Sequence, residues 1–254
     1  MIPKIIHLCW FGGNEYPALV KKCVSSWEEK LPDYEIKKWD ESSFPVNDYP
    51  FTREAYSQKK WAFVSDYVRL VALYEYGGVY MDTDLEVIKD FTPLLTEESF
   101  VSSRIEGELI TAGFIAAEPK HPFIKALIEY YEAKMIDRAG NTTFVMNPLV
   151  FTRVAMNAYS FPLNKKSFRN GDMVIYSLDY FMPYHKNMIS KRPYSQSNYH
   201  ITENTYAIHH DMGSWGHQSK MKRAVKGLIR LVVPEPFYRR LKRIKFEKEL
   251  SKEK

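Results

Sequence analysis

The stretch from residue 62 to residue 84 constrains the fold of this chain more than any other part of its sequence. An apolar helical pattern ends at two glycines, a short apolar run follows, and the run closes on Asp82 and Asp84. If that run is extended, its period of two places Tyr80 and both aspartates on one face. Two carboxylates that point into one site suit a hard divalent cation carrying a diphosphate.

A second charged pair lies upstream in the helical pattern. Asp66 and Arg69 are three residues apart, so they share a helix face. They predict two further charged groups at the same site, across the glycine turn from the aspartates. The alternative is a salt bridge on the helix surface, which contributes only a few tenths of a kcal/mol.

The N-terminal part of the chain has the pattern of a strand, a helix and a strand. We predict a strand over 4–11, a helix over about 17–30 and a second strand over 34–39. This order favours a parallel sheet, in which ligands bind at the carboxyl ends of the strands. Trp10 and Asp82 both follow predicted strands, and they share a cleft if those strands are neighbours.

The remaining core elements are predicted from apolar spacing. Residues 40–52 have the composition of a loop, and a long helix is expected over about 53–76. Strands are expected over 100–103 and 110–117, and a helix after His121-Pro122 continues to about residue 134.

Three blocks carry a resemblance to a known family. They are the helix–Gly-Gly–Asp-Thr-Asp segment, the opening Ile2-Pro3-Lys4-Ile5-Ile6-His7-Leu8-Cys9-Trp10-Phe11-Gly12-Gly13, and the late His209-His210-Asp211-Met212-Gly213-Ser214-Trp215. The chain resembles the DXD-containing region of glycosyltransferase family 32, including bacterial capsular and lipopolysaccharide enzymes, and its core resembles the large clostridial glucosylating toxins. The resemblance implies an α/β GT-A fold, with a mostly parallel Rossmann-like sheet flanked by helices.

The resemblance also implies a metal site. Asp82 and Asp84 would hold Mn²⁺ or Mg²⁺ on the diphosphate of a nucleotide-sugar donor, with Asp84 the closer ligand. A late histidine would complete the shell, and the spacing to the toxins' tryptophan favours His210, with His209 as the alternative. Both options agree with the tolerance of Mn²⁺ for imidazole.

Donor contacts are assigned by the same resemblance. Arg69 would hydrogen-bond the sugar or diphosphate, and Asp66 would accept the sugar's hydroxyl groups. Trp10 would stack on the nucleobase, although burial in the core is an equal alternative. Ser214 and Trp215 would form a lid over the diphosphate. Tyr80 is included with the donor-binding residues because it shares the strand face of the aspartates.

The C-terminal tail differs in charge from the rest of the chain. Residues 220–254 hold 13 Lys and Arg against 4 Asp and Glu, while the whole chain carries +5, so the other 219 residues carry −4. We predict a catalytic domain over 1–218 and a basic helical extension over 219–254. Two short amphipathic helices in this tail would suit an anionic membrane surface. The alternative is one helix docked on the catalytic domain.

The location is predicted from what the sequence lacks. No run approaches the roughly 20 apolar residues of a membrane span, and Pro3, Lys4 and His7 interrupt any signal-peptide core. Two cysteines fit a reducing compartment. We therefore expect a cytoplasmic protein, which the basic tail could bring to the inner face of the plasma membrane.

The resemblance implies a metal-dependent hexosyl- or N-acetylhexosaminyltransferase. By resemblance it would act with retention, take a UDP-sugar in preference to other donors, and extend a lipid-linked or oligosaccharide acceptor in capsular polysaccharide, O-antigen or lipopolysaccharide synthesis. The alternatives are an idle nucleotide-sugar-binding protein and a basic nucleic-acid-binding module. The nucleic-acid-binding alternative is disfavoured because the basic charge is confined to the tail. Nucleic acid is therefore not an expected partner.

Overall fold

The computed structural model describes residues 1–105, 109–136, 142–163, 165–185, 194–212 and 235–251. Among these residues, no helix combines the length and the apolar character that a membrane span requires. The chain begins with strand β1 (Ile5–Cys9), helix α1 (Ala18–Lys30) and strand β2 (Glu35–Trp39), and β1 and β2 are parallel. The predicted strand–helix–strand opening is therefore confirmed.

The other elements follow in chain order. They are α2 (Pro50–Ser57), α3 (Trp61–Tyr76), β3 (Gly78–Met81), β4 (Leu85–Val87), η1 (Thr92–Leu94), β5 (Phe100–Arg104), β6 (Ile110–Ala117), α4 (Pro122–Lys134), α5 (Asn147–Tyr159), β7 (Phe168–Asn170), β8 (Met173–Tyr176), η2 (Leu178–Tyr180), η3 (Gln196–Asn198), β9 (Ala207–His209) and α7 (Glu235–Ser251).

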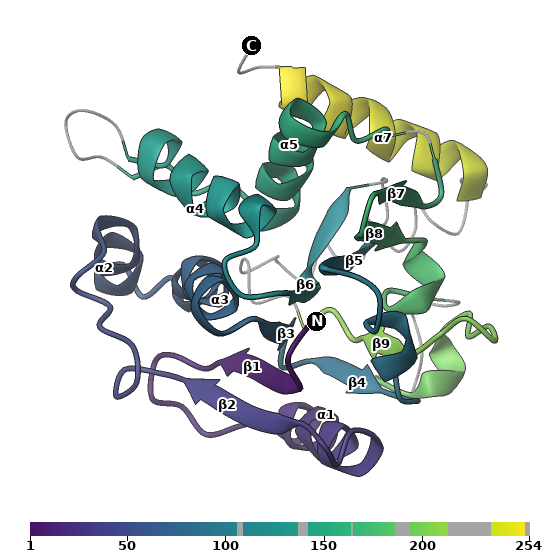
Figure 1. Cartoon of the computed structure of the whole chain (residues 1–254), viewed down its shortest axis with the longest axis horizontal. Coiled ribbons are helices and arrows are strands. Elements are labelled where there is room, and N and C mark those ends of the chain that lie inside the picture. The colour runs from purple at the N-terminus through teal and green to yellow at the C-terminus, as the bar shows by residue number, and fades with distance from the viewer. Residues whose placement is uncertain (106–108, 137–141, 164, 186–193, 213–234, 252–254) are drawn as a thin grey trace, which may run out of the picture.

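The described residues form a seven-stranded sheet in the order β2-β1-β3-β6-β5-β8-β7 and a two-stranded sheet of β4 and β9. Five strands of the large sheet run in one direction, and only β6 and β7 run against them. Helices α3, α4 and α5 cover one face, while α1 and the small sheet cover the other (Figure 1). The predicted α/β arrangement, with a mostly parallel sheet flanked by helices, is confirmed.

The prediction of one long helix over about 53–76 is wrong in one respect. Two helices, α2 and α3, occupy this part of the chain, and α2 begins within the predicted loop. Lys59 between them adopts a left-handed backbone conformation (φ 55°), which a continuous helix excludes. The break lets α2 turn away from α3 (Figure 1).

The end of the basic tail forms a helix that contacts α5 and Leu109. Leu250 of α7 packs with Leu149 of α5 and Leu109, and the Arg153 guanidinium donates a hydrogen bond of 3.2 Å to the Glu249 carbonyl. This is the contact expected of the docked-helix alternative. The first predicted tail helix lies outside the described residues, and the domain boundary at 218 stays a prediction.

Candidate metal and nucleotide-sugar site

The two aspartates lie at the carboxyl edge of the large sheet, just beyond β3. The strand ends at Met81, and a turn closed by the Leu85 amide on the Asp82 carbonyl (3.0 Å) carries both aspartates into β4. The expectation that both extend the strand face of Tyr80 is therefore wrong for Asp84, whereas Asp82 does accept a hydrogen bond from Tyr80. A turn brings both carboxylates to one site instead.

A histidine from the small sheet completes this cluster. Strand β9 pairs with β4 so that His209 lies opposite Leu85, directly beside the aspartate turn. Its Nε2 atom lies 3.4 Å from Asp82 Oδ2 and 3.2 Å from Asp84 Oδ1. One ligand atom from each of Asp82, Asp84 and His209 lies within 4.8 Å of the others. We call these three residues the open cluster, because each side chain keeps between 12% and 23% of its surface exposed.

The charges of the open cluster support one another. Burial raises the pKa of Asp82, but the Arg69 guanidinium and His209 outweigh it, so the pKa falls to about 2. Burial lowers the pKa of His209, but Asp84, Asp211 and Asp82 outweigh it and the pKa rises well above its usual value. The two neighbouring carboxylates thus favour a positive charge between them.

Arg69 connects the open cluster to the interior. Its guanidinium lies 3.3 Å from Asp82 Oδ1 and 3.0 Å from Asp66 Oδ1, and it donates a 2.7 Å hydrogen bond to the Ala112 carbonyl. The Tyr80 ring packs under the guanidinium at 4.2 Å, and its hydroxyl donates to Asp82 Oδ1 at 2.8 Å. Both side chains are almost fully buried. The structure therefore brings Arg69 and Tyr80 to Asp82 as its supports.

Asp66 lies deeper still. The side chain is fully buried, Asn147 Nδ2 donates to Oδ1 at 2.8 Å, and Oδ2 has no hydrogen-bond partner. Burial raises the pKa of Asp66 well above its usual value despite the opposing effect of Arg69. Asp66 holds Arg69 in this geometry, and its contact with a sugar stays a prediction.

His210 faces away from the aspartates. The prediction that His210, in preference to His209, completes the metal shell is therefore corrected. The Nε2 atom of His210 lies 2.8 Å from Glu86 Oε2, and Nδ1 lies 3.0 Å from the Tyr199 hydroxyl. Lys22 and Gln196 donate to the same carboxylate at 2.7 Å and 2.8 Å. The physical reason is the period of two along the strand, which sends adjacent side chains to opposite faces. We call Glu86 and His210, with these partners, the closed cluster.

Trp10 lies beyond β1, which is the direct neighbour of β3. The side chain is half-buried, its ring packs edge-on against Tyr16 at 4.9 Å, and Nε1 donates to the Asn14 carbonyl at 2.6 Å. Trp10 and Asp82 therefore share the carboxyl edge of adjacent strands, as predicted. Stacking on a nucleobase stays a prediction, and Ser214 and Trp215 lie outside the described residues.

Sequence reasoning missed three residues that shape the site. A Cβ atom on Gly113 would lie 2.8 Å from Asp82 Oδ2, so only glycine leaves room for this carboxylate. A glycine inside an apolar strand is a signal for such a close approach. No sequence pattern marked Asn147 or Glu86, because each contacts a residue from a remote part of the chain.

One family model matches the part of the chain that holds the two aspartates. Residues 17–101 match the family model of the glycosyltransferase sugar-binding region containing the DXD motif, which includes both aspartates and Arg69. This match covers about a third of the chain, and over that stretch the chain is similar to the sugar-binding region of the DXD-containing glycosyltransferases.

Two curated relatives and one solved structure show how far the likeness extends. Inositol phosphoceramide mannosyltransferase 1 of Schizosaccharomyces pombe is 29% identical over 59% of this chain and 47% of its own length. Inositol phosphoceramide mannosyltransferase 3 of the same yeast is 32% identical over 50% and 36%. The chain thus spans less than half the length of either relative. The galactosyltransferase LgtC is 16% identical over 92% of this chain and 99% of its own, with a TM-score of 0.45.

Proposed function

We propose that this protein is a metal-dependent glycosyltransferase that moves a sugar from a nucleoside-diphosphate donor to a glycan or glycolipid acceptor. One observation carries the proposal: Asp82, Asp84 and His209 converge at the carboxyl edge of the sheet, within or beside the region that matches the DXD family. Two carboxylates and an imidazole are a donor set that Mn²⁺ accepts.

The residues of the open cluster fit the chemistry of the leaving group. A nucleoside diphosphate accumulates negative charge as its bond to the sugar breaks, and a divalent cation bound to the phosphates stabilises that charge without a proton transfer. Asp82, Asp84 and His209 would hold the cation. Arg69 and Tyr80 keep Asp82 in place, because a ligand held by packing and hydrogen bonds loses little freedom on binding.

The finer predictions remain part of this proposal. Retention of configuration and the UDP preference rest on the resemblance to family 32 and the toxins. The matched relatives are named for mannosyl transfer to inositol phosphoceramide, which supports a lipid-bearing acceptor and makes mannose a sugar to test. None of these relatives' names supports capsular polysaccharide, O-antigen or lipopolysaccharide synthesis over other acceptors.

A thermal-shift panel with a hydrolysis assay tests the proposal. UDP, GDP and their sugars are added with and without Mn²⁺, and a ligand that binds the folded state raises the melting temperature. We expect one base to stabilise the protein only with Mn²⁺, and the matching sugar nucleotide to be slowly hydrolysed. Binding without hydrolysis or transfer would favour the idle nucleotide-sugar-binding alternative. No shift with any nucleotide would refute the proposal.

A further inference from the structure

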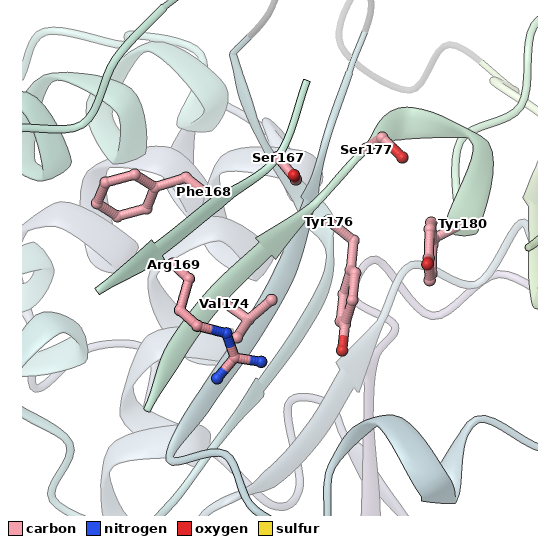
Figure 2. Close-up of a pocket in the computed structure, with 7 residues that line it drawn as sticks. All are labelled: Ser167, Phe168, Arg169, Val174, Tyr176, Ser177 and Tyr180. Carbon is pink, nitrogen blue, oxygen red and sulfur yellow. The ribbon is translucent and has the colours of Figure 1, made fainter. Parts of the chain in front are cut away.

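A pocket lies beside β8 and β7, the last two strands of the large sheet, several strands away from the open cluster. It has a volume of about 270 Å³ and is formed by β7, β8 and η2. Figure 2 shows Val174 between the Arg169 guanidinium on one side and the Tyr176 ring on the other. Ser167 and Ser177 contribute hydroxyl groups to the same lining. A volume of this size accommodates one sugar ring.

Stacked tyrosines form one wall of the pocket. The rings of Tyr176 and Tyr180 are 4.4 Å apart and 16° from parallel, and those of Tyr180 and Tyr206 are 5.9 Å apart at 19°. Tyr176 and Tyr180 both line the pocket and are only partly buried. A flat aromatic face carries a negative quadrupole, so it attracts the weakly positive C–H face of a pyranose and excludes water from it.

The opposite wall is polar but neutral overall. Arg169 donates to both oxygens of Glu98, at 3.0 Å and 2.6 Å, and more weakly to the Gly171 carbonyl at 3.5 Å. A guanidinium has five N–H donors, so Arg169 still offers donors to the hydroxyl groups of a ligand in the pocket. Because Glu98 already compensates the charge of Arg169, this wall suits a neutral polyol better than a phosphate.

The tyrosine wall of the pocket lies at the same carboxyl end of the strands as the open cluster. Tyr80 pairs with Ile115, Ile115 with Ser102, and Ser102 with Ile175, so Tyr80 and Ile175 belong to one row across four strands. Three strand spacings put them about 14 Å apart. Asp82 and Tyr176 extend from this row towards the same edge.

The segment after η2 connects the two places. Tyr180 lines the pocket, and two residues later Met182 lies beside the open cluster. A Cβ atom on Gly113 would lie 3.2 Å from Met182 Cε and 2.8 Å from Asp82 Oδ2. The distance between the pocket and the open cluster is therefore too long for one sugar. A short oligosaccharide that lies along this segment could span it.

We propose that this pocket is a remote saccharide subsite, which holds a neutral sugar of the acceptor glycan while another sugar of the same glycan reaches the open cluster. This inference rests on the proposed glycosyltransferase function and names the acceptor class of that site. The subsite selects acceptors of several sugars over a single sugar, because only the longer chain contacts both places.

Saturation-transfer NMR tests the subsite directly. Mannotriose, maltotriose and chitotriose are added to the full chain without donor or metal. We expect saturation transfer to at least one trisaccharide. Binding should be roughly fivefold to tenfold weaker in Tyr176→Ala, because the stacking face is lost, and unchanged in Tyr176→Phe, which retains the ring. Ser167 is exposed, so Ser167→Trp should fill the pocket without disturbing the core.

The outcomes separate this inference from the proposed function. Absence of saturation transfer with all three trisaccharides would overturn the subsite, as would transfer that persists in both Tyr176→Ala and Ser167→Trp. If Tyr176→Ala does not fold, Ser167→Trp decides alone. Donor hydrolysis is measured in parallel and should be equal in Ser167→Trp and the wild-type protein. Loss of hydrolysis in every protein would refute the proposed function, while the binding result would still decide the subsite.

Discussion

The open and closed clusters use the same residue types and yet differ in what they can bind. Strand β9 ends at His209, which meets two carboxylates that keep part of their surface in solvent, and the next residue, His210, meets one buried carboxylate. In the closed cluster, Glu86 receives hydrogen bonds from His210, Lys22 and Gln196. A carboxylate with three donors stabilises the fold, whereas two neighbouring carboxylates that share one histidine favour a cation.

The largest expected effect comes from the open cluster. Asp84→Ala should lower Mn²⁺-dependent nucleotide binding and donor turnover at least about 100-fold, because it removes a direct ligand. Thermal unfolding should change little, since the side chain is partly exposed and few contacts are lost. Isothermal titration with nucleotide, with and without Mn²⁺, measures the effect. Undiminished Mn²⁺-dependent turnover in this variant would show that Asp84 does not bind the cation.

Acid should weaken the closed cluster. Burial raises the pKa of Glu86, but hydrogen bonds from His210, Lys22 and Gln196 outweigh it and lower the pKa from 4.5 to about 2. A carboxylate whose pKa is lower in the folded state stabilises the protein above the unfolded pKa, and this contribution disappears as the pH falls from about 4.5 to 2. Its full size is up to about 3 kcal/mol.

Denaturant unfolding at several pH values measures that contribution. The free energy of unfolding of the wild-type protein should fall more steeply between pH 5 and pH 3 than that of Glu86→Gln, which cannot titrate. Equal slopes for the two proteins would mean that the closed cluster does not hold an ionised carboxylate.

The smallest expected effects come from substituting the two adjacent histidines, one from each cluster. His209→Ala should weaken nucleotide affinity about tenfold, and only when Mn²⁺ is present. His210→Ala should instead lower the free energy of unfolding by about 1–3 kcal/mol, because it leaves a buried carboxylate with one donor fewer. Titration and denaturant unfolding of both variants test the two roles. The opposite assignment would restore His210 as the ligand.

The adjacent histidines also show where sequence reasoning stops. The apolar periods predicted β1, α1, β2 and the strand that leads to the aspartates, because these depend on local spacing. Which of His209 and His210 meets the aspartates depends on the pairing of β9 with β4, across more than 120 residues. Asn147 contacts Asp66, and Gly113 lies against Asp82, although both partners are distant in the sequence. Local patterns therefore located the site, and only the fold could complete it.

Anomalous diffraction from crystals soaked with Mn²⁺ and a nucleoside diphosphate tests the central claim most directly. The claim is that the open cluster is the site of the cation. It predicts a manganese peak within coordination distance of Asp84 and at least one of Asp82 and His209, next to the diphosphate. A peak at Glu86 and His210, or nucleotide bound at this edge with no manganese beside the aspartates, would contradict it.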